Sequence, residues 1–286
     1  MKNFIKKIIP PLLWEFLVGL KTYVSIFKYK KLLSKNIALK DLHKGKRCFI
    51  LGSGPSIKKQ NLGHLKDEIV FALNNFYVHE EFSNIISNTN VEKYYMTAPI
   101  HPPQTEEEWK DWFIDIEKNV PVNVKTLFGL NGNKINIKYI FDKYGLFKQH
   151  IKFWYYEGKQ FKNEKKLNGM DITSAIYSGE SVSVYTLILA IYMGFSEIYL
   201  LGMDHDYFLY DDESEMRMYK TSIHQNNEFE RTFGDTFYIK EFLRQYNIFS
   251  KYHAFGVNSS SKIYNASAGG ILKVFPKVNF ENLFKK

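Results

Sequence analysis

A chain of 286 residues with 45% hydrophobic residues is long enough for one large domain with its own core and too short for two full-sized domains. Its formal charge of +9 arises within residues 1–46, which hold eleven lysines and two acids, whereas basic and acidic residues balance over residues 47–286. A nucleic-acid enzyme would carry positive charge around its site, so this distribution argues against nucleic-acid binding. The single cysteine, Cys48, excludes an internal disulfide and is typical of a reducing compartment such as the cytoplasm.

Residues 1–45 are predicted to form a basic, amphipathic helical tail at a membrane surface. The apolar run Ile8–Leu20 contains two prolines and Glu15 and is shorter than the roughly 20 residues that a membrane-spanning helix needs. Aromatic residues then alternate with lysines, as in a helix lying among lipid headgroups, where each lysine contributes about 1 kcal/mol near an anionic surface. We expect the tail to hold a catalytic domain, residues 46–286, at the inner face of the membrane. The alternative is a helix packed on the enzyme body or on a second subunit.

After the tail, short apolar runs alternate with helical segments, which predicts an α/β, Rossmann-like fold with a mainly parallel sheet. The clearest helix spans Glu180–Met193, where apolar side chains recur at helical spacing, Ser178 or Ser181 can cap its start, and Gly194 ends it. The polar segment at 206–230 is predicted to be a lid-like insertion. The predicted strands are Arg47–Leu51, Ile69–Leu73, Lys93–Met96, Lys125–Phe128, Ile151–Tyr155, Glu197–Leu201 and Lys251–Phe255.

The segment Gly52-Ser53-Gly54-Pro55-Ser56 directly follows the first predicted strand. Glycines at such a turn let backbone N–H groups approach a phosphate, and the N-terminus of a following helix adds partial positive charge. The segment is not a Walker loop, which contains Gly-Lys-Ser/Thr, and Ile57 replaces the third glycine of a dinucleotide fingerprint. It predicts phosphate binding, and a tight strand-to-helix turn is the alternative.

Two further polar clusters follow strands at the same expected edge of the sheet. Asn74 and Asn75 end the second strand, where nucleotide-binding folds place a residue that reads the ribose or base, and an amide there argues against the NAD pattern. Asp204 and Asp206 follow the strand Glu197–Leu201 and could hold Mg²⁺ against a diphosphate. In the alternative, the asparagines satisfy a turn, Asp204 binds backbone or a ligand hydroxyl, and Asp206 is solvated.

These motifs, together with the run Tyr192–Asp204, resemble the bacterial CMP-sialic acid sialyltransferases of glycosyltransferase family 42. They also resemble a domain named after an archaeal 6-hydroxymethylpterin pyrophosphokinase, which recurs in bacterial surface-glycan proteins, and the run Ile263–Gly270 looks more like this second group. The resemblance covers residues 46–277 in patches. It implies the GT-A-like variant of the Rossmann-like fold.

The resemblance also implies roles for individual residues. In the sialyltransferases the Gly-rich loop and an asparagine after the second strand bind CMP, tyrosines contact the leaving phosphate, and a histidine takes the proton of the acceptor hydroxyl. Carried over, the phosphate contacts fall to Tyr207 and, more loosely, Tyr210, and the catalytic base is His224. Asn75 stands in place of a glutamine, and Thr97 in place of an asparagine after the third strand. The implied nucleotide-binding residues are Gly52, Ser53, Gly54, Pro55, Ser56, Asn74, Asn75, Thr97 and Asp204.

The sequence thus predicts an inverting glycosyltransferase that moves a CMP-activated acidic sugar, of sialic acid or Kdo type, onto a bacterial surface glycan or lipid-linked acceptor. This chemistry requires no metal cofactor. The first alternative is a Mg²⁺-dependent pyrophosphokinase or nucleotide-diphosphate-sugar transferase that uses Asp204 and Asp206. The second is a non-catalytic nucleotide- or glycan-binding subunit. The expected partners are the nucleotide-sugar donor, the glycan acceptor and an anionic membrane, and a homo-oligomer is compatible with the sequence.

Overall fold

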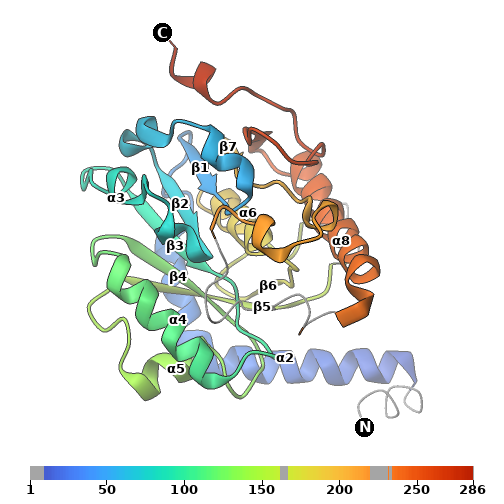
Figure 1. Cartoon of the computed structure of the whole chain (residues 1–286). Coiled ribbons are helices and arrows are strands. Elements are labelled where there is room, and N and C mark those ends of the chain that lie inside the picture. The colour runs from blue at the N-terminus through green and yellow to red at the C-terminus, as the bar shows by residue number, and fades with distance from the viewer. Residues whose placement is uncertain (1–9, 162–166, 220–230, 232–233, 286) are drawn as a thin grey trace.

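One parallel sheet organises the molecule. The computed structural model describes residues 10–161, 167–219, 231 and 234–285. Within these residues eight strands, all parallel, lie in the order β6-β5-β4-β3-β2-β1-β7-β8 (Figure 1), which confirms the predicted α/β, Rossmann-like fold. The strands are β1 (Arg47–Leu51), β2 (Val70–Leu73), β3 (Lys93–Thr97), β4 (Lys125–Leu130), β5 (Lys152–Lys159), β6 (Ala175–Tyr177), β7 (Glu197–Leu201) and β8 (Lys262–Asn265).

Helices cover both faces of the sheet, and each face has its own hydrophobic core. The helices are α2 (Pro11–Leu33), α3 (Phe82–Ile85), α4 (Glu106–Asn119), α5 (Ile137–Tyr144), α6 (Val182–Tyr192) and α8 (Phe237–Asn258). Side chains of α2, α3, α4 and α5 share one core, and those of α6 and α8 share the other. In β1, Phe49 and Leu51 enter the first core and Cys48 and Ile50 the second, because successive side chains of a strand point to opposite faces.

Most of the predicted elements are found. Both β1 and β7 have the predicted bounds, β2 to β5 differ from prediction by a few residues, and α6 begins after the Ser181 cap and ends just before Gly194, whose φ is +81°. The strand predicted at Lys251–Phe255 is wrong, because this segment lies inside α8. Its buried residues continue the helical spacing set by Ile248, which a window of five residues cannot distinguish from a buried strand. The short strands β6 and β8 were not predicted.

The second half of α2 belongs to the fold, contrary to the predicted tail boundary at residue 45. The Tyr29 ring lies 5.9 Å from that of Tyr156 on β5, and Leu33 is completely buried. Just beyond the helix, the buried amide of Asn36 donates hydrogen bonds to the carbonyl oxygens of Trp154 at 2.6 Å and Ile172 at 2.7 Å. Removing residues 1–40 would therefore take away core side chains, so the folding unit starts within α2.

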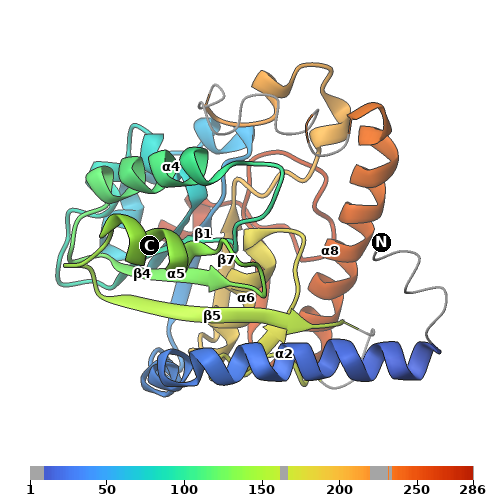
Figure 2. The ribbon, with the colours of Figure 1, turned by 90° about the horizontal axis from the view of Figure 1, so that it is seen from below.

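The opposite face of α2 is apolar and exposed. Its exposed apolar side chains alternate at spacings of four and three residues, so they form one narrow stripe along the helix. Figure 2 shows α2 running beside β5 in the opposite direction and extending past the carboxyl end of that strand. None of the helices in the described ranges is both long and apolar enough to cross a membrane. The stripe consists of Leu13, Leu17, Leu20, Val24 and Phe27.

The order of the strands fixes where a ligand can bind. From β1 the chain builds outward through β2 to β6 on one side, and it then crosses to place β7 and β8 on the other side. The loops that leave β1 and β7 therefore diverge at the carboxyl edge of the sheet. Open parallel sheets bind ligands in the crevice at such a switch point.

Candidate functional site

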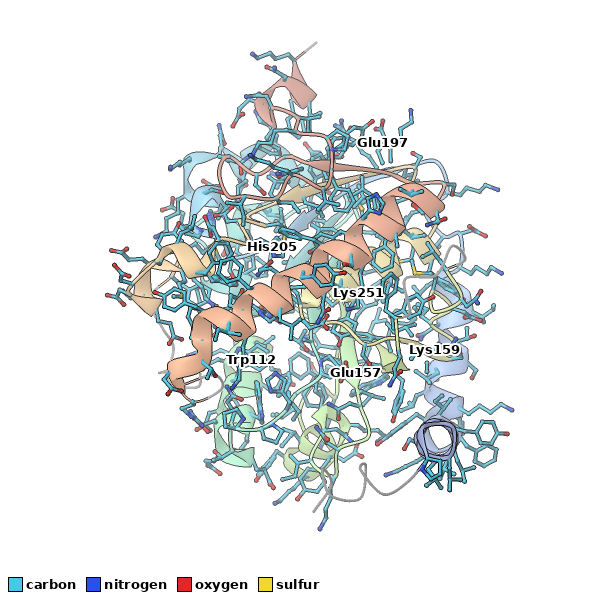
Figure 3. The ribbon with its side chains drawn as sticks, turned by 90° about the vertical axis from the view of Figure 1, so that its right-hand side faces the viewer. Trp112, Glu157, Lys159, Glu197, His205 and Lys251 are labelled. Atoms are coloured by element: carbon cyan, nitrogen blue, oxygen red, sulfur yellow. The ribbon has the colours of Figure 1, made fainter. Side chains whose placement is uncertain are left out.

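A cavity of about 280 Å³ opens at this switch point. Its wall draws on the carboxyl ends of β1, β2, β5 and β7, on the start of α6 and on one face of α8. Figure 3 looks onto α8, with two of the lining residues, His205 and Glu157, on opposite sides of the helix in this view. The lining is mixed, with arginines, carboxylates, histidines and tyrosines beside glycine backbone, as expected for a polar, charged ligand.

The Gly-rich segment is bound to the loop after β7. The Gly54 N–H donates to the Gly202 carbonyl oxygen at 2.8 Å. The Ser56 N–H and hydroxyl donate to the two carboxylate oxygens of Asp204, at 2.8 Å and 2.5 Å. These backbone N–H groups are therefore engaged within the protein and do not point at a phosphate. We call the contact between these two loops the loop bracket.

Close approach, rather than phosphate binding, explains the glycines of this segment. A Cβ atom on Gly54 would lie 2.5 Å from Cγ of Asp204, and one on Gly52 would lie 2.6 Å from the carbonyl oxygen of Gly202. Gly202 itself has φ of +61°, in the left-handed region that favours glycine. Both loops can meet only because neither carries a side chain at these points.

The remaining residues of the segment divide between cavity and scaffold. Gly52 and Ser53 line the cavity, and Gly54, Pro55 and Ser56 do not. Pro55 begins a short 3-10 helix, Pro55–Lys59, which is not the longer helix that an N-terminal phosphate site requires. The sequence therefore located the crevice correctly, although the expected donors are already occupied.

Asn74 has the features of a ligand-binding residue. It lines the cavity, its φ is +49°, and its side-chain oxygen is buried without a hydrogen-bond partner among the described residues. A left-handed non-glycine residue and a buried unsatisfied acceptor are both costly, and such features concentrate at functional sites. By contrast, Asn75 and Thr97 are fully buried away from the cavity, where Asn75 accepts a hydrogen bond from the Trp112 indole.

Two arginines supply the positive charge of the cavity, and neither was predicted. Arg217 and Arg244 both line it, and the Arg244 guanidinium lies 5.5 Å from the ring centroid of Tyr207. Arg244 also forms an ion pair of 2.7 Å with the buried Glu241. Composition offered a signal: only four of the 39 basic residues are arginine, and three of these four follow Asp206.

Of the two tyrosines to which the resemblance assigned phosphate contacts, Tyr207 lines the cavity and Tyr210 does not. Burial raises the pKa of the Tyr207 phenol, so this group is a neutral hydrogen-bond donor near pH 7. The Tyr210 hydroxyl instead contacts the Asp206 carboxylate at 3.4 Å. His224 lies outside the described residues, as does the predicted lid from residue 220 onward.

Two histidines line the cavity and differ in their environments. His205 is buried between Gln245, 3.0 Å from its Nδ1, and the Tyr252 hydroxyl, 3.2 Å from its Nε2. Burial, with the nearby charge of Arg244, lowers the pKa of His205 to about 3, so this ring stays neutral and structural. His101 is exposed, and its Nδ1 lies 2.7 Å from the Pro102 carbonyl oxygen. That contact requires the proton on Nδ1 and leaves Nε2 able to accept one.

Three carboxylates near the cavity have different environments. Burial raises the pKa of Glu157, although the hydrogen bond from the Tyr185 hydroxyl acts in the opposite direction. Burial and the neighbouring Asp204 raise the pKa of Asp206. Both oxygens of Asp204 accept hydrogen bonds from Ser56, and no group of three potential metal ligands occurs among the residues that the structure describes.

The loop bracket leaves no room for a side chain at residue 54, which can be tested by substitution of Gly54. We expect Gly54→Ala to destabilise the protein by about 1–3 kcal/mol, because the new Cβ would force Asp204 away from Ser56. Gly256→Ala is the matched control: its Cβ would meet Phe275 at an ordinary 3.4 Å, and alanine in the last turn of α8 should add at most about 1 kcal/mol of stability. Urea unfolding measures both variants. Equal stability of Gly54→Ala and the parent protein would contradict this role.

Comparison with known proteins assigns no family. No protein-family model matches the chain, and no curated protein matches it significantly. The chemistry of the cavity is therefore the basis for a function.

Proposed function

We propose that this chain is an inverting glycosyltransferase that uses a CMP-activated acidic sugar. The observation that carries this proposal is the cavity at the β1/β7 switch point, which combines two arginines with an unsatisfied asparagine oxygen at Asn74. An arginine suits a phosphate or carboxylate, and an amide oxygen can accept a hydrogen bond from a cytosine amine or a ribose hydroxyl. The resemblance to the sialyltransferases supports the same donor class.

The reaction needs little from the protein beyond charge and one base. A nucleoside monophosphate leaves readily from the tertiary anomeric carbon of an acidic sugar, and the developing negative charge on its phosphate is stabilised by cationic and hydroxyl donors. Arg217 and Tyr207 both line the cavity, which supports this role for them. Because Ser56 engages both oxygens of Asp204, a Mg²⁺-dependent reaction that uses Asp204 and Asp206 is less well supported.

Nucleotide choice tests the proposal directly. We expect CMP or CDP to raise the melting temperature more than ATP with Mg²⁺, UDP or NAD, with about 2.7 kcal/mol of stabilisation at 100 times the dissociation constant.

Arg217→Gln should weaken cytidine-nucleotide binding by about 10- to 100-fold, because a charge-assisted hydrogen bond contributes about 1.5–3 kcal/mol. Arg231→Gln is the control, since Arg231 pairs with Glu108 at 2.6 Å and does not line the cavity. Stabilisation by ATP with Mg²⁺ but by no cytidine nucleotide would refute the donor assignment.

The catalytic base is the second part of the proposal. Among the described residues, His101 fits best because it lines the cavity, is accessible and holds its neutral-ring proton on Nδ1, so that Nε2 is the acceptor atom. We expect His101→Asn to lower turnover about 10²- to 10⁴-fold with nearly unchanged CMP affinity. Steady-state kinetics on this variant and on His224→Asn compare the two candidates. Loss of turnover in His224→Asn alone would give the role to His224.

We further propose that the exposed stripe of α2 rests on an anionic membrane. Lys28, Lys30 and Lys31 are exposed near the C-terminal end of the same helix, so positive charge lies beside the apolar stripe there. That charge opposes pairing with a second copy of α2 and complements acidic lipid headgroups. Because the helix extends past the carboxyl end of β5, lipid contact there would bring the membrane to the side of the molecule where the cavity lies (Figure 2).

Vesicle sedimentation tests this contact. We expect the protein to pellet with phosphatidylserine vesicles but not with phosphatidylcholine vesicles, and less so at high salt, since screening acts over about 8 Å at physiological ionic strength. The double variant Leu20→Asp/Val24→Asp should lose binding, whereas Val78→Asp/Val122→Asp, at other exposed valines, should retain it. The stripe would instead be a contact between two copies of the chain if the parent protein does not bind vesicles and forms a dimer that the Leu20→Asp/Val24→Asp variant does not form.

A further inference from the structure

A second cavity, of about 430 Å³, lies between α8 and the residues around β5 and β6. We infer that it binds the acceptor, as a neutral, hydroxyl-rich sugar next to the donor cavity. The inference rests on the proposed glycosyl transfer. Figure 3 shows Lys251, one of its lining residues, between α8 and the end of β5 that carries Glu157 and Lys159.

The two cavities share a wall. Glu180 lines both of them, so groups bound in the two cavities approach each other at this residue. Its carboxylate pairs with the Lys251 ammonium at 2.7 Å, and its carbonyl oxygen accepts a hydrogen bond from Arg244 at 3.1 Å. Both partners come from α8, so the wall is fixed to a long helix. A hydroxyl of a sugar bound in the second cavity would thus lie next to a donor bound in the first.

The lining of the second cavity has the composition of a sugar site. Phe161 and the 69% exposed Tyr246 offer ring faces, against which the C–H face of a sugar can pack. Gln160, Ser178 and Asn247 have side-chain donors and acceptors that make no hydrogen bond with other described residues. Amides and hydroxyls both donate and accept, which matches sugar hydroxyls.

The charges of this cavity favour a neutral ligand. Lys251 is its only cationic side chain among the described lining residues, and Glu180 its only anionic one. The two neutralise each other in the ion pair, and the Lys251 ammonium also lies 5.7 Å from the Phe161 ring centroid. An anionic acceptor would have to break this pair. A neutral sugar would leave it in place.

Saturation-transfer NMR with galactose, glucose and N-acetylglucosamine tests the site on the full chain without nucleotide. We expect at least one of these sugars to bind, and Tyr246→Ala and Asn247→Ala each to weaken that binding about tenfold or more. Tyr238→Ala, a tyrosine exposed on the same helix but outside the cavity, is the control and should bind like the parent protein. CMP affinity should be the same in all four proteins.

The possible outcomes separate the two proposals. No binding of any of the three sugars, or equal binding by Tyr246→Ala and the parent protein, overturns the acceptor site. Sugar binding that depends on Tyr246, in a protein that binds no cytidine nucleotide, upholds the site and refutes the proposed donor. With an active donor, Tyr246→Ala should raise KM for the sugar and leave hydrolysis of the donor by water unchanged.

Discussion

The contact between the loops after β1 and β7 is the constraint on which the site depends. The sheet brings the two strands together, and the loop bracket then fixes how far their ends can diverge. Asp204 accepts two hydrogen bonds from Ser56 while it is almost completely buried, a position that a carboxylate tolerates only when it is fully hydrogen-bonded. Gly52 and Gly202, which flank the bracket, form one wall of the cavity, and its charged residues come from other elements.

Lysines and arginines also occupy different parts of the chain. Lysines dominate the N-terminal region, and each carries its charge as a compact ammonium on a long, flexible side chain. Arginines occur where geometry matters: Arg47 pairs with Glu68, Arg231 with Glu108, and Arg244 with Glu241. In a chain so rich in lysine, the choice of arginine marks places where a planar, multidentate cation is needed.

The sequence predicted the sheet and the crevice because both depend on local patterns. Apolar runs revealed the strands, and the glycines after β1 revealed a place where backbones meet. It could not assign the donors in that crevice, since the Gly54 N–H is bonded to the Gly202 carbonyl oxygen and the Ser56 N–H to Asp204, each 148 residues later in the chain. Arg217 and Arg244 reach the cavity only through tertiary structure, and α2 packs on β5 through contacts that no local window contains.

The packing of α2 also has a consequence for biosynthesis. Asn36, just after the helix, bonds to Trp154, which is 118 residues away in the chain. At typical translation speeds of about 5–20 residues per second, the ribosome needs about 6–24 s to make that stretch. Throughout this interval the helix has emerged without the strand that covers one of its faces, while the apolar stripe on its other face is exposed in the structure that the described residues form. During this delay the apolar side chains of the helix are exposed to solvent, which makes the growing chain prone to aggregation until β5 has been made.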